Sequence, residues 1–276
     1  MKILRAKHLG MCFGVRDAIA LAYQKALTEP LTILGELVHN DSVSAMLQER
    51  GIESQSDLTN VSGGTVMITA HGASHKVLRK IHEKGLEVVE ATCPLVRLAH
   101  DTLTDLVAAG YYPIIIGLRN HVEVRGMTED LDEFDVVLSE QEVSDLTERP
   151  RFGIVAQTTQ PVSKVRRLVQ LIRQRFPQSE VRYQDTVCLP TKQRQHAAIE
   201  LARQSDVVLV IGGGHSNNTH ELMRTCRQFC QRVFHVQDLS QLQREWFAGA
   251  ETIGITAGTS TPDAVIDAIE RWLNQL

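Results

Sequence analysis

The sequence lacks several features that would place it in a common class of protein. No apolar stretch among its 276 residues approaches the roughly 20 residues that a membrane span requires. The formal net charge is −4, so there is no excess of positive charge to attract nucleic acid. Residues Met1–Lys7 lack the apolar core of a signal peptide. We therefore expect a cytoplasmic protein that binds neither a membrane nor nucleic acid.

Cysteines are few, and their pattern counts against two common uses of this residue. Their number, five, is odd, which disfavours a closed disulfide framework and suits a reducing compartment. Cys12, Cys93 and Cys188 stand far apart, whereas structural zinc sites usually pair their ligands within a few residues. Cys226 and Cys230 lie on one apolar helical stripe, so we expect them to pack in the core.

Three of the cysteines divide the chain into near-equal thirds. Cys12, Cys93 and Cys188 each stand between an extended-looking stretch and an amphipathic helical pattern. Three α/β units that each contribute one thiolate to a common centre would account for this spacing. Soft thiolate ligands suit an iron–sulfur cluster. Three ligands instead of four would leave one iron open to a substrate, which predicts an enzyme.

Each third then presents further polar residues at the ends of its apolar runs. The first set follows its cysteine at nearly constant spacing and consists of His39, His121 and Ser216. The second set follows at looser spacing and consists of His71, Thr158 and Ser260. A strand, a helix and their loops occupy roughly 30 residues, so this spacing predicts one chemical residue per strand-to-helix turn. Because ligands bind beyond the carboxyl ends of parallel strands, all these tips could line one cavity.

The alternation of elements predicts the α/β class. Six apolar runs read as buried strands, at residues 65–70, 113–117, 134–138, 152–156, 206–212 and 252–257. Helical stripes lie between them, which implies mainly parallel sheets with right-handed crossovers. No low-complexity linker marks a boundary. The repeat alone predicts three pseudo-equivalent units around a central cluster, at residues 1–94, 95–189 and 190–276.

Several of these residues suit an anionic substrate. His39, His71 and His121 could supply cationic or hydrogen-bonding imidazoles. The segment Ser216-Asn217-Asn218 opens a helix after three glycines, Gly212-Gly213-Gly214, which we call the glycine loop. This arrangement serves either as a plain N-cap or as a phosphate cradle. A second such loop at Ser260 favours the cradle.

Glu123 is the carboxylate that stands beside a histidine within these tips. An extended tip would point the side chains of His121 and Glu123 the same way, because residues i and i+2 share a face. A general acid is one interpretation of this pair. A salt bridge without a chemical role is the other.

Taken together, these motifs resemble the 4-hydroxy-3-methylbut-2-enyl diphosphate reductase family over essentially the whole chain. The motifs are Cys12-Phe13-Gly14-Val15, Glu36-Leu37-Val38-His39-Asn40, Ala70-His71-Gly72, Ala91-Thr92-Cys93-Pro94, His121-Val122-Glu123-Val124-Arg125-Gly126, Gln157-Thr158-Thr159, Asp185-Thr186-Val187-Cys188 with Arg194-Gln195, and Thr256-Ala257-Gly258-Thr259-Ser260. The resemblance implies a three-lobed α/β protein with a [4Fe-4S] cluster at its centre.

The resemblance also implies a role for each candidate residue. The cluster ligands would be Cys12, Cys93 and Cys188. The residues that grip the diphosphate would be His39, His71, Ser216, Asn217, Asn218 and Ser260. The residues that face the substrate hydroxyl would be His121, Glu123 and Thr158, with Glu123 as the acid. The chain departs from the family at Val122, Ala156, Gly214 and Asn217, where proline, threonine, lysine and serine are usual.

By this resemblance the chain would reductively remove the hydroxyl group of 4-hydroxy-3-methylbut-2-enyl diphosphate to give isopentenyl and dimethylallyl diphosphate. No nicotinamide or flavin fingerprint is present, so a separate ferredoxin or flavodoxin would supply the electrons. Because the glycine loop is altered, a paralogue or an iron–sulfur hydro-lyase acting on another phosphorylated alcohol stays open. So does a non-catalytic, cluster-binding redox module.

Overall fold

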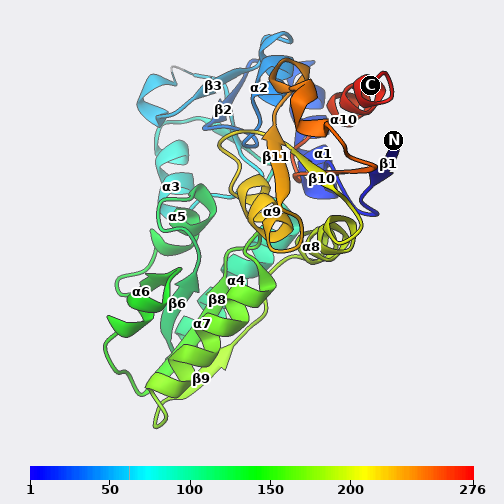
Figure 1. Ribbon diagram of the computed structural model, residues 1–276. Coiled ribbons are helices and arrows are strands. Elements are labelled where there is room, and N and C mark those ends of the chain that lie inside the picture. Colours follow the sequence, from blue (N-terminus) through cyan, green and yellow to red (C-terminus); the bar gives the residue numbers. More distant parts are fainter. Residues whose placement is uncertain (62) are drawn as a thin grey trace. The chain divides into compact units, whose positions relative to one another are not determined.

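The computed structural model describes residues 1–61 and 63–276, and within them the chain forms three sheets of four strands each (Figure 1). Every pairing between neighbouring strands is parallel. Helices follow the strands in alternation, as parallel pairing requires. The α/β class with parallel sheets, predicted from the sequence, is confirmed. Within the same residues, no helix is both long and apolar enough to span a membrane.

The chain divides into two compact units. Unit 1 comprises Met1–Arg16, Val38–Arg50 and Leu189–Leu276, and unit 2 comprises Asp17–Leu37 and Gly51–Cys188. Unit 1 contains one of the sheets, and unit 2 contains the other two. The division into three units with boundaries near residues 94 and 189 stays a prediction.

The first sheet of unit 2 has the strand order β3-β2-β4-β5. Its strands are β2 (Leu31–Leu34), β3 (Glu53–Gln55), β4 (Thr65–Ile68) and β5 (Glu87–Glu90). A 3₁₀ turn at Leu58–Asn60 precedes β4, and helix α3 (His75–Glu83) connects β4 to β5. Ser74 caps α3 by accepting a hydrogen bond from the Val77 N–H.

The second sheet of unit 2 has the strand order β7-β6-β8-β9. Its strands are β6 (Tyr112–Ile116), β7 (Asp135–Val137), β8 (Arg151–Ala156) and β9 (Glu180–Tyr183). Its helices are α4 (Pro94–Ala108), α5 (Val122–Thr128), α6 (Glu140–Ser144) and α7 (Val162–Arg175).

The sheet of unit 1 has the order β11-β10-β12-β1. Its strands are β1 (Lys2–Arg5), β10 (Val207–Ile211), β11 (Arg232–Val236) and β12 (Thr252–Ala257). The unit also contains α2 (Asp41–Gln48), α8 (Leu189–Ala202), α9 (Asn217–Arg227), α10 (Asp263–Leu273), and 3₁₀ turns at Leu239–Gln241 and Arg244–Phe247. Helix α1 (Phe13–Ala26) begins in unit 1 and continues into unit 2.

The three sheets share one connectivity. In each, three consecutive strands are arranged so that the first of them lies between the second and the third, and one further strand, the fourth, pairs with the third and forms the edge. The N-terminal strand β1 takes this fourth place in the sheet of β10, β11 and β12. As a result, each predicted ligand cysteine follows a fourth strand and precedes a helix: Cys12 before α1, Cys93 before α4 and Cys188 before α8.

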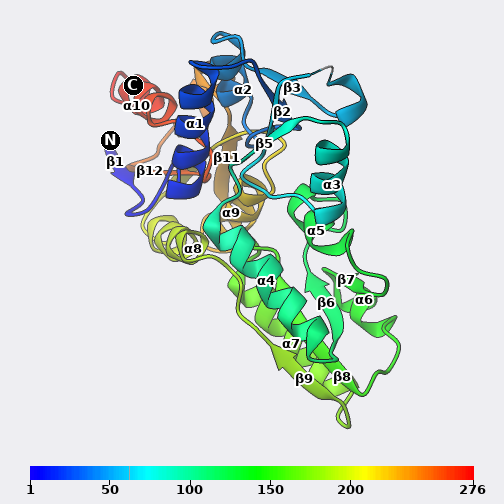
Figure 2. The ribbon, with the colours of Figure 1, turned by 180° about the vertical axis from the view of Figure 1, so that it is seen from behind.

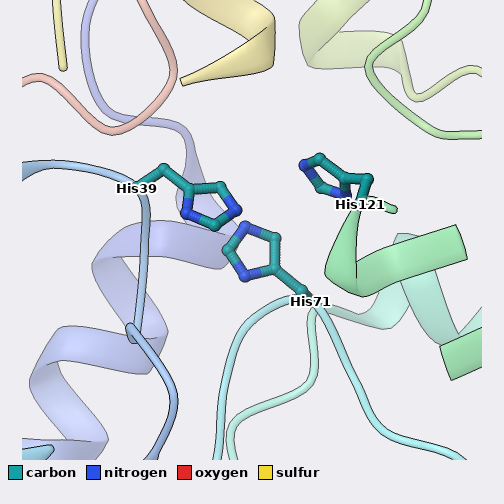
Figure 3. Close-up of side chains that lie close together, drawn as sticks. All are labelled: His39, His71 and His121. Atoms are coloured by element: carbon teal, nitrogen blue, oxygen red, sulfur yellow. The ribbon is translucent and has the colours of Figure 1, made fainter. Parts of the chain in front are cut away.

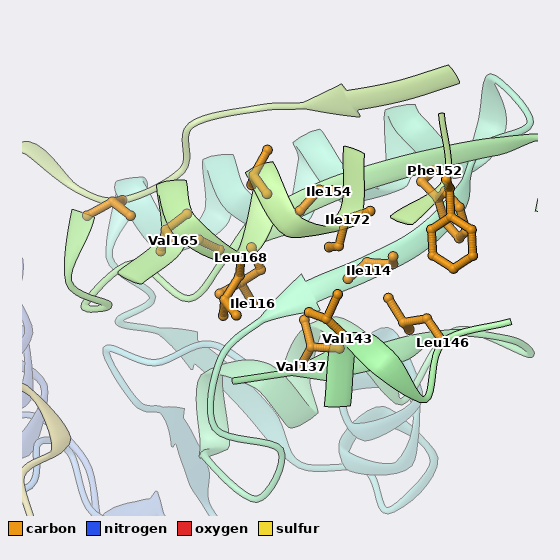
Figure 4. Packing of buried hydrophobic residues seen from close by; sticks show 14 residues of the cluster. Ile114, Ile116, Val137, Val143, Leu146, Phe152, Ile154, Val165, Leu168 and Ile172 are labelled. Carbon is orange, nitrogen blue, oxygen red and sulfur yellow. The ribbon is translucent and has the colours of Figure 1, made fainter. Parts of the chain in front are cut away.

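The second sheet of unit 2 is covered on both faces. Ile114 and Ile116 pack against α7 on one face, and Ile115 packs against α4 on the other, because successive side chains of a strand alternate (Figures 2 and 4). All three isoleucines are fully buried. A strand buried on both faces reads as an uninterrupted apolar run, which is why the sequence revealed β6 so plainly.

Candidate functional site

The three cysteines predicted to bind a cluster occupy equivalent places in their sheets. The backbone N–H of each donates to a carbonyl in the loop that follows the third strand of the same sheet. These bonds run from Cys12 to Thr259 at 3.0 Å, from Cys93 to Ala70 at 3.1 Å, and from Cys188 to Thr158 at 3.0 Å. The equivalence inferred from spacing is thus reproduced in the main-chain hydrogen bonds.

The five cysteines fall into two groups by burial. Cys12, Cys93 and Cys188 are half-buried thiols at helix starts, whereas Cys226 and Cys230 are buried. Burial raises the pKa of the Cys226 thiol to about 12. Cys226 and Cys230 therefore pack in the core, as the helical stripe predicted.

Glu123 is a buried carboxyl in the first turn of α5, with 1% of its surface exposed. The backbone N–H of Thr158 donates to Oε1 at 2.6 Å, and the Thr158 hydroxyl donates to Oε2 at 3.0 Å. Burial raises the pKa of Glu123 to about 7, although the two hydrogen bonds from Thr158 act to lower it. The carboxyl is therefore poised to hold or release a proton near neutral pH.

The condition of an extended tip is not met, because Glu123 lies in the first turn of a helix. Helix α5 begins at Val122, and His121 is its N-cap. The His121 Nδ1 atom accepts a hydrogen bond from the Glu123 backbone N–H at 3.2 Å. In the neutral ring the proton therefore lies on Nε2, which makes that nitrogen the donor.

Two predicted histidines of unit 2 lie side by side. The ring centroids of His71 and His121 are 5.6 Å apart, and the rings meet edge to face (Figure 3). His71 lies in the loop after β4, and His121 lies in the loop after β6. Unit 2 thus places His71, His121, Glu123 and Thr158 beyond the carboxyl ends of strands of its two sheets.

Gln157 fixes the loop of Glu123 to the loop of Thr158. Its fully buried side chain accepts a hydrogen bond from the Leu118 N–H at 3.1 Å. A methyl group at Gly117 would lie only 2.9 Å from Gln157 Cβ, so glycine is needed for this close approach. The sequence motif contained Gln157, but its spacing indicated no role for it.

His100, in the second turn of α4, was also assigned no role. A methyl group at Gly126 would lie 3.1 Å from His100 Cε1, and one at Gly72 would lie 3.6 Å from it. The ring therefore fills the space between α5 and the loop after His71. Burial lowers the pKa of His100, which favours the neutral form of the ring.

In unit 1, the glycine loop leads into α9 and presents hydrogen-bond donors. Ser216 caps α9, its hydroxyl oxygen accepting from the Thr219 N–H at 3.3 Å. The Nδ2 atoms of Asn217 and Asn218 are buried and make no hydrogen bond within unit 1 or elsewhere in the described chain. Buried donors beside the positive end of a helix provide a setting for an anion.

His39 and Ser260 meet at the same loop. The Ser260 hydroxyl donates to the His39 carbonyl at 3.3 Å. A methyl group at Gly213 would lie 2.5 Å from that carbonyl oxygen, so only glycine allows the glycine loop to approach this closely. Unit 1 therefore gathers His39, Ser216 and Ser260, which are far apart in sequence.

Two histidines to which the sequence motifs gave no role support the glycine loop. The Nε2 atom of His220 donates to the Gly214 carbonyl at 2.6 Å, and that of His235 donates to the Gly212 carbonyl at 2.8 Å. The side chain of Gln237 accepts from the Gly214 N–H at 2.8 Å. No local pattern reveals such contacts, because they join a loop to side chains on separate elements.

The comparisons with known proteins agree with this arrangement. A family model described as the LytB protein matches residues 3–274. The chain belongs to the LytB family. A relative from Trichlorobacter lovleyi, named 4-hydroxy-3-methylbut-2-enyl diphosphate reductase, is 38% identical over 278 residues, which cover 100% of this chain and 99% of the relative.

Two solved structures resemble this LytB-family chain along its whole length. One, the E-1-hydroxy-2-methyl-but-2-enyl-4-diphosphate reductase from Plasmodium falciparum, has a TM-score of 0.92 and 26% identity, and covers 100% of this chain and 87% of that one. The other is described as (E)-4-hydroxy-3-methyl-but-2-enyl diphosphate reductase, the terminal enzyme of the non-mevalonate pathway. Its TM-score is 0.72 at 32% identity, with both chains fully covered. The family resemblance drawn from the motifs is thereby confirmed.

Proposed function

We propose that this LytB-family chain reductively removes the hydroxyl group of 4-hydroxy-3-methylbut-2-enyl diphosphate and yields isopentenyl and dimethylallyl diphosphate. The proposal is supported by relatives that are named as this reductase and that align with the chain over nearly their full length. The observation that carries it is the Glu123 carboxyl, which is buried, bonded to Thr158 and has a pKa raised to about 7. A group of this kind can protonate a leaving hydroxyl at neutral pH.

The donor set fits an iron–sulfur cluster. Cys12, Cys93 and Cys188 are half-buried thiols in three equivalent places, each at the start of a helix. Cys226 and Cys230 are buried and hydrogen-bonded to main-chain carbonyls, so they are unsuited to ligation. We propose that the first three cysteines hold a [4Fe-4S] cluster. When bound, it would supply electrons one at a time and a Lewis-acidic iron without a protein ligand.

Proton delivery falls to Glu123. Hydroxide is a poor leaving group, so a proton must reach the substrate oxygen as the C–O bond breaks. In the protonated carboxyl, one oxygen accepts from the Thr158 N–H and the other carries the proton. The Thr158 hydroxyl touches that second oxygen and can relay the proton. The Nε2–H of His121 would orient the substrate hydroxyl.

The diphosphate would bind to the residues at the start of α9. The amides of Asn217 and Asn218 are buried without hydrogen bonds in the described chain and can donate to phosphate oxygens. Ser216, Ser260, His39 and His71 would complete the site. The hydroxyl of Ser216 already accepts from Thr219 and keeps its proton to donate.

The reaction balances with two electrons and two protons. One proton leaves with the hydroxyl as water, and the other adds to either end of the allyl group. An external ferredoxin or flavodoxin would deliver the electrons, and a reducing cytoplasm would keep the three thiols available. Both the electron donor and the compartment are proposals.

An anaerobic assay with reduced methyl viologen tests the function. The reconstituted protein should consume the hydroxylated diphosphate and release both isomers, identified by mass spectrometry. Cys93→Ser should abolish the brown absorbance and the turnover, whereas Cys226→Ser, which removes a core thiol, should leave both intact. Release of water without reductant would favour a hydro-lyase instead. Full iron content in Cys93→Ser would contradict the ligand assignment.

A further inference from the structure

Arg194 is a buried cation in unit 1 that donates hydrogen bonds to two main-chain carbonyls. It lies on α8 with 7% of its surface exposed. Its Nε and Nη2 atoms both donate to the Gly10 carbonyl, at 3.1 and 2.5 Å, and its Nη1 atom donates to the Pro190 carbonyl at 3.1 Å. The planar guanidinium thus holds two segments at once in one fixed geometry.

Both carbonyls lie beside predicted ligand cysteines. Gly10 stands two residues before Cys12, and Pro190 stands two residues after Cys188. One side chain therefore joins the segment that leads into Cys12 to the helix that begins after Cys188. Hydrogen bonds from a charged donor are among the stronger ones in proteins, which suits Arg194 to fix these segments.

The Gly10 peptide is also confined from the opposite side. Its φ angle is +75°, and a methyl group there would lie 2.9 Å from Ile266 Cδ1. Its N–H donates to the Ala257 carbonyl at 3.3 Å, and the N–H of Cys12 donates to the Thr259 carbonyl at 3.0 Å. Arg194 holds the Gly10 carbonyl, and main-chain carbonyls hold the N–H groups of Gly10 and Cys12. The backbone that leads into Cys12 is therefore fixed by hydrogen bonds at three groups.

We propose that Arg194 is a positioning residue that orders the Cys12 segment for ligation before any cluster is inserted. The inference rests on the proposed function insofar as Cys12 is taken as a ligand. The ordering of residues 7–14 is a property of the protein alone and can be measured without a cluster.

The matched variants are Arg194→Met, Arg194→Lys and Arg232→Met. Methionine keeps much of the side-chain volume without donors, and lysine keeps the charge without the planar fork. Arg232 also donates to two main-chain carbonyls of unit 1, those of Asp206 and Ala248, away from any predicted ligand. Its loss controls for a general weakening of the unit.

The first measurement is amide hydrogen exchange of the cluster-free protein. Arg194→Met should speed exchange at Cys12 by about tenfold or more, and Arg194→Lys should give an intermediate rate. In the Arg194 variants, the Cys93 segment (residues 89–96) should exchange at the wild-type rate. In Arg232→Met, the amide of Cys12 should exchange at the wild-type rate. A further variant, Arg194→Ala, leaves space for a free guanidinium ion: low, non-denaturing guanidinium should restore its protection, whereas an equal concentration of sodium chloride should not.

The second measurement is the rate at which iron and sulfide rebuild the brown chromophore. Arg194→Met should rebuild it at least several-fold more slowly than Arg232→Met. A wild-type exchange rate at Cys12 in both Arg194→Met and Arg194→Lys would overturn the inference. If Arg194→Met does not fold, a wild-type rate in Arg194→Lys alone would overturn it. If the wild-type protein itself takes up no cluster, the proposed function fails, while the exchange data still judge Arg194.

Discussion

The loops after β6 and β10 hold equivalent places in their sheets and carry opposite chemistry. Each begins with a glycine, Gly117 or Gly212, that donates to the last residue of the neighbouring strand. Each then turns into a helix whose second residue is buried: Glu123 in α5 and Asn218 in α9. In unit 2 the position holds a carboxyl that Thr158 satisfies, and in unit 1 it holds an amide donor with no partner in the described chain.

The difference shows that one scaffold can carry either a carboxyl or an amide donor at the start of a helix. The positive end of a helix favours a negative group. In α5 the chain supplies that group itself, as the buried carboxyl of Glu123. In α9 the corresponding side chain is the amide donor of Asn218, and under the proposed function this place would receive an anion of the substrate. Substitutions that swap or remove these features are considered below, in order of decreasing expected effect.

Removal of the acid should have the largest effect. Glu123→Gln keeps the shape and can still bond to Thr158, but it has no proton to transfer at neutral pH. Positioned acid catalysis contributes about 10²–10⁴-fold, so kcat should fall by that factor while KM changes little. Anaerobic steady-state kinetics checks this, with the exposed Glu133→Gln as control. A wild-type kcat in Glu123→Gln would place the acid elsewhere.

Asn218→Asp should make the α9 position resemble that of Glu123. A carboxylate at the anion site replaces a donor with a like charge, so the apparent KM should rise about 10- to 100-fold. Cluster content, read from the iron assay, should not change. Asn274→Asp, at the exposed end of α10, controls for an added negative charge. An unchanged KM would move the diphosphate site away from α9.

The buried carboxyl should also appear in the pH dependence of stability. Its pKa is raised from 4.5 to about 7 in the folded protein, so folding binds a proton between these values. The stabilisation is fully present below pH 4.5 and is lost as the pH rises through about 7. Glu123→Gln should remove this loss, which amounts to about 3 kcal/mol above pH 8. Urea unfolding at pH 5 and pH 8.5 tests it: a constant difference between variant and wild type would refute the assignment.

The smallest effect should come from the two loop glycines. A methyl group at Gly212 collides with the Thr219 hydroxyl, and one at Gly117 meets Val124 Cγ2 at 2.9 Å. Gly212→Ala and Gly117→Ala should each lower the free energy of unfolding by about 1–3 kcal/mol. Gly63→Ala, where the added methyl meets nothing within 4 Å, is the control. Equal free energies of unfolding for all three variants would mean that the loops accommodate the added methyl group without destabilising the fold.

The sequence predicted the parts of this molecule whose cause is local. Buried strands such as β6, β8 and β10 were found because strands covered on both faces are apolar throughout. Edge strand β3 (Glu53–Gln55) is polar throughout, and edge strand β5 (Glu87–Glu90) has a glutamate at each end, so neither gave such a signal.

The chemical residues show the same division. The cysteines and strand-end tips were found by spacing, since the chain repeats one connectivity three times. The support of the glycine loop by His220 and His235 was not found, because those contacts depend on tertiary packing. The helical start at Val122 was missed as well, since an N-cap histidine is an uncommon signal there.

The place of β1 in the sheet of unit 1 bears on the order of events during synthesis. Lys2 pairs with Thr252, so β1 gains its neighbouring strand only after β12, the last strand of the described chain, has been synthesised. Until then, the segment that carries Cys12 has neither the Thr259 carbonyl nor the side chain of Arg194 to hold it. The two sheets of unit 2 involve no such delay, since all their strands lie between residues 31 and 183. A nascent chain can therefore complete the sheet of β6 to β9 before β12 is made, whereas the Cys12 segment gains these contacts only after β12 and the loop that follows it have been synthesised.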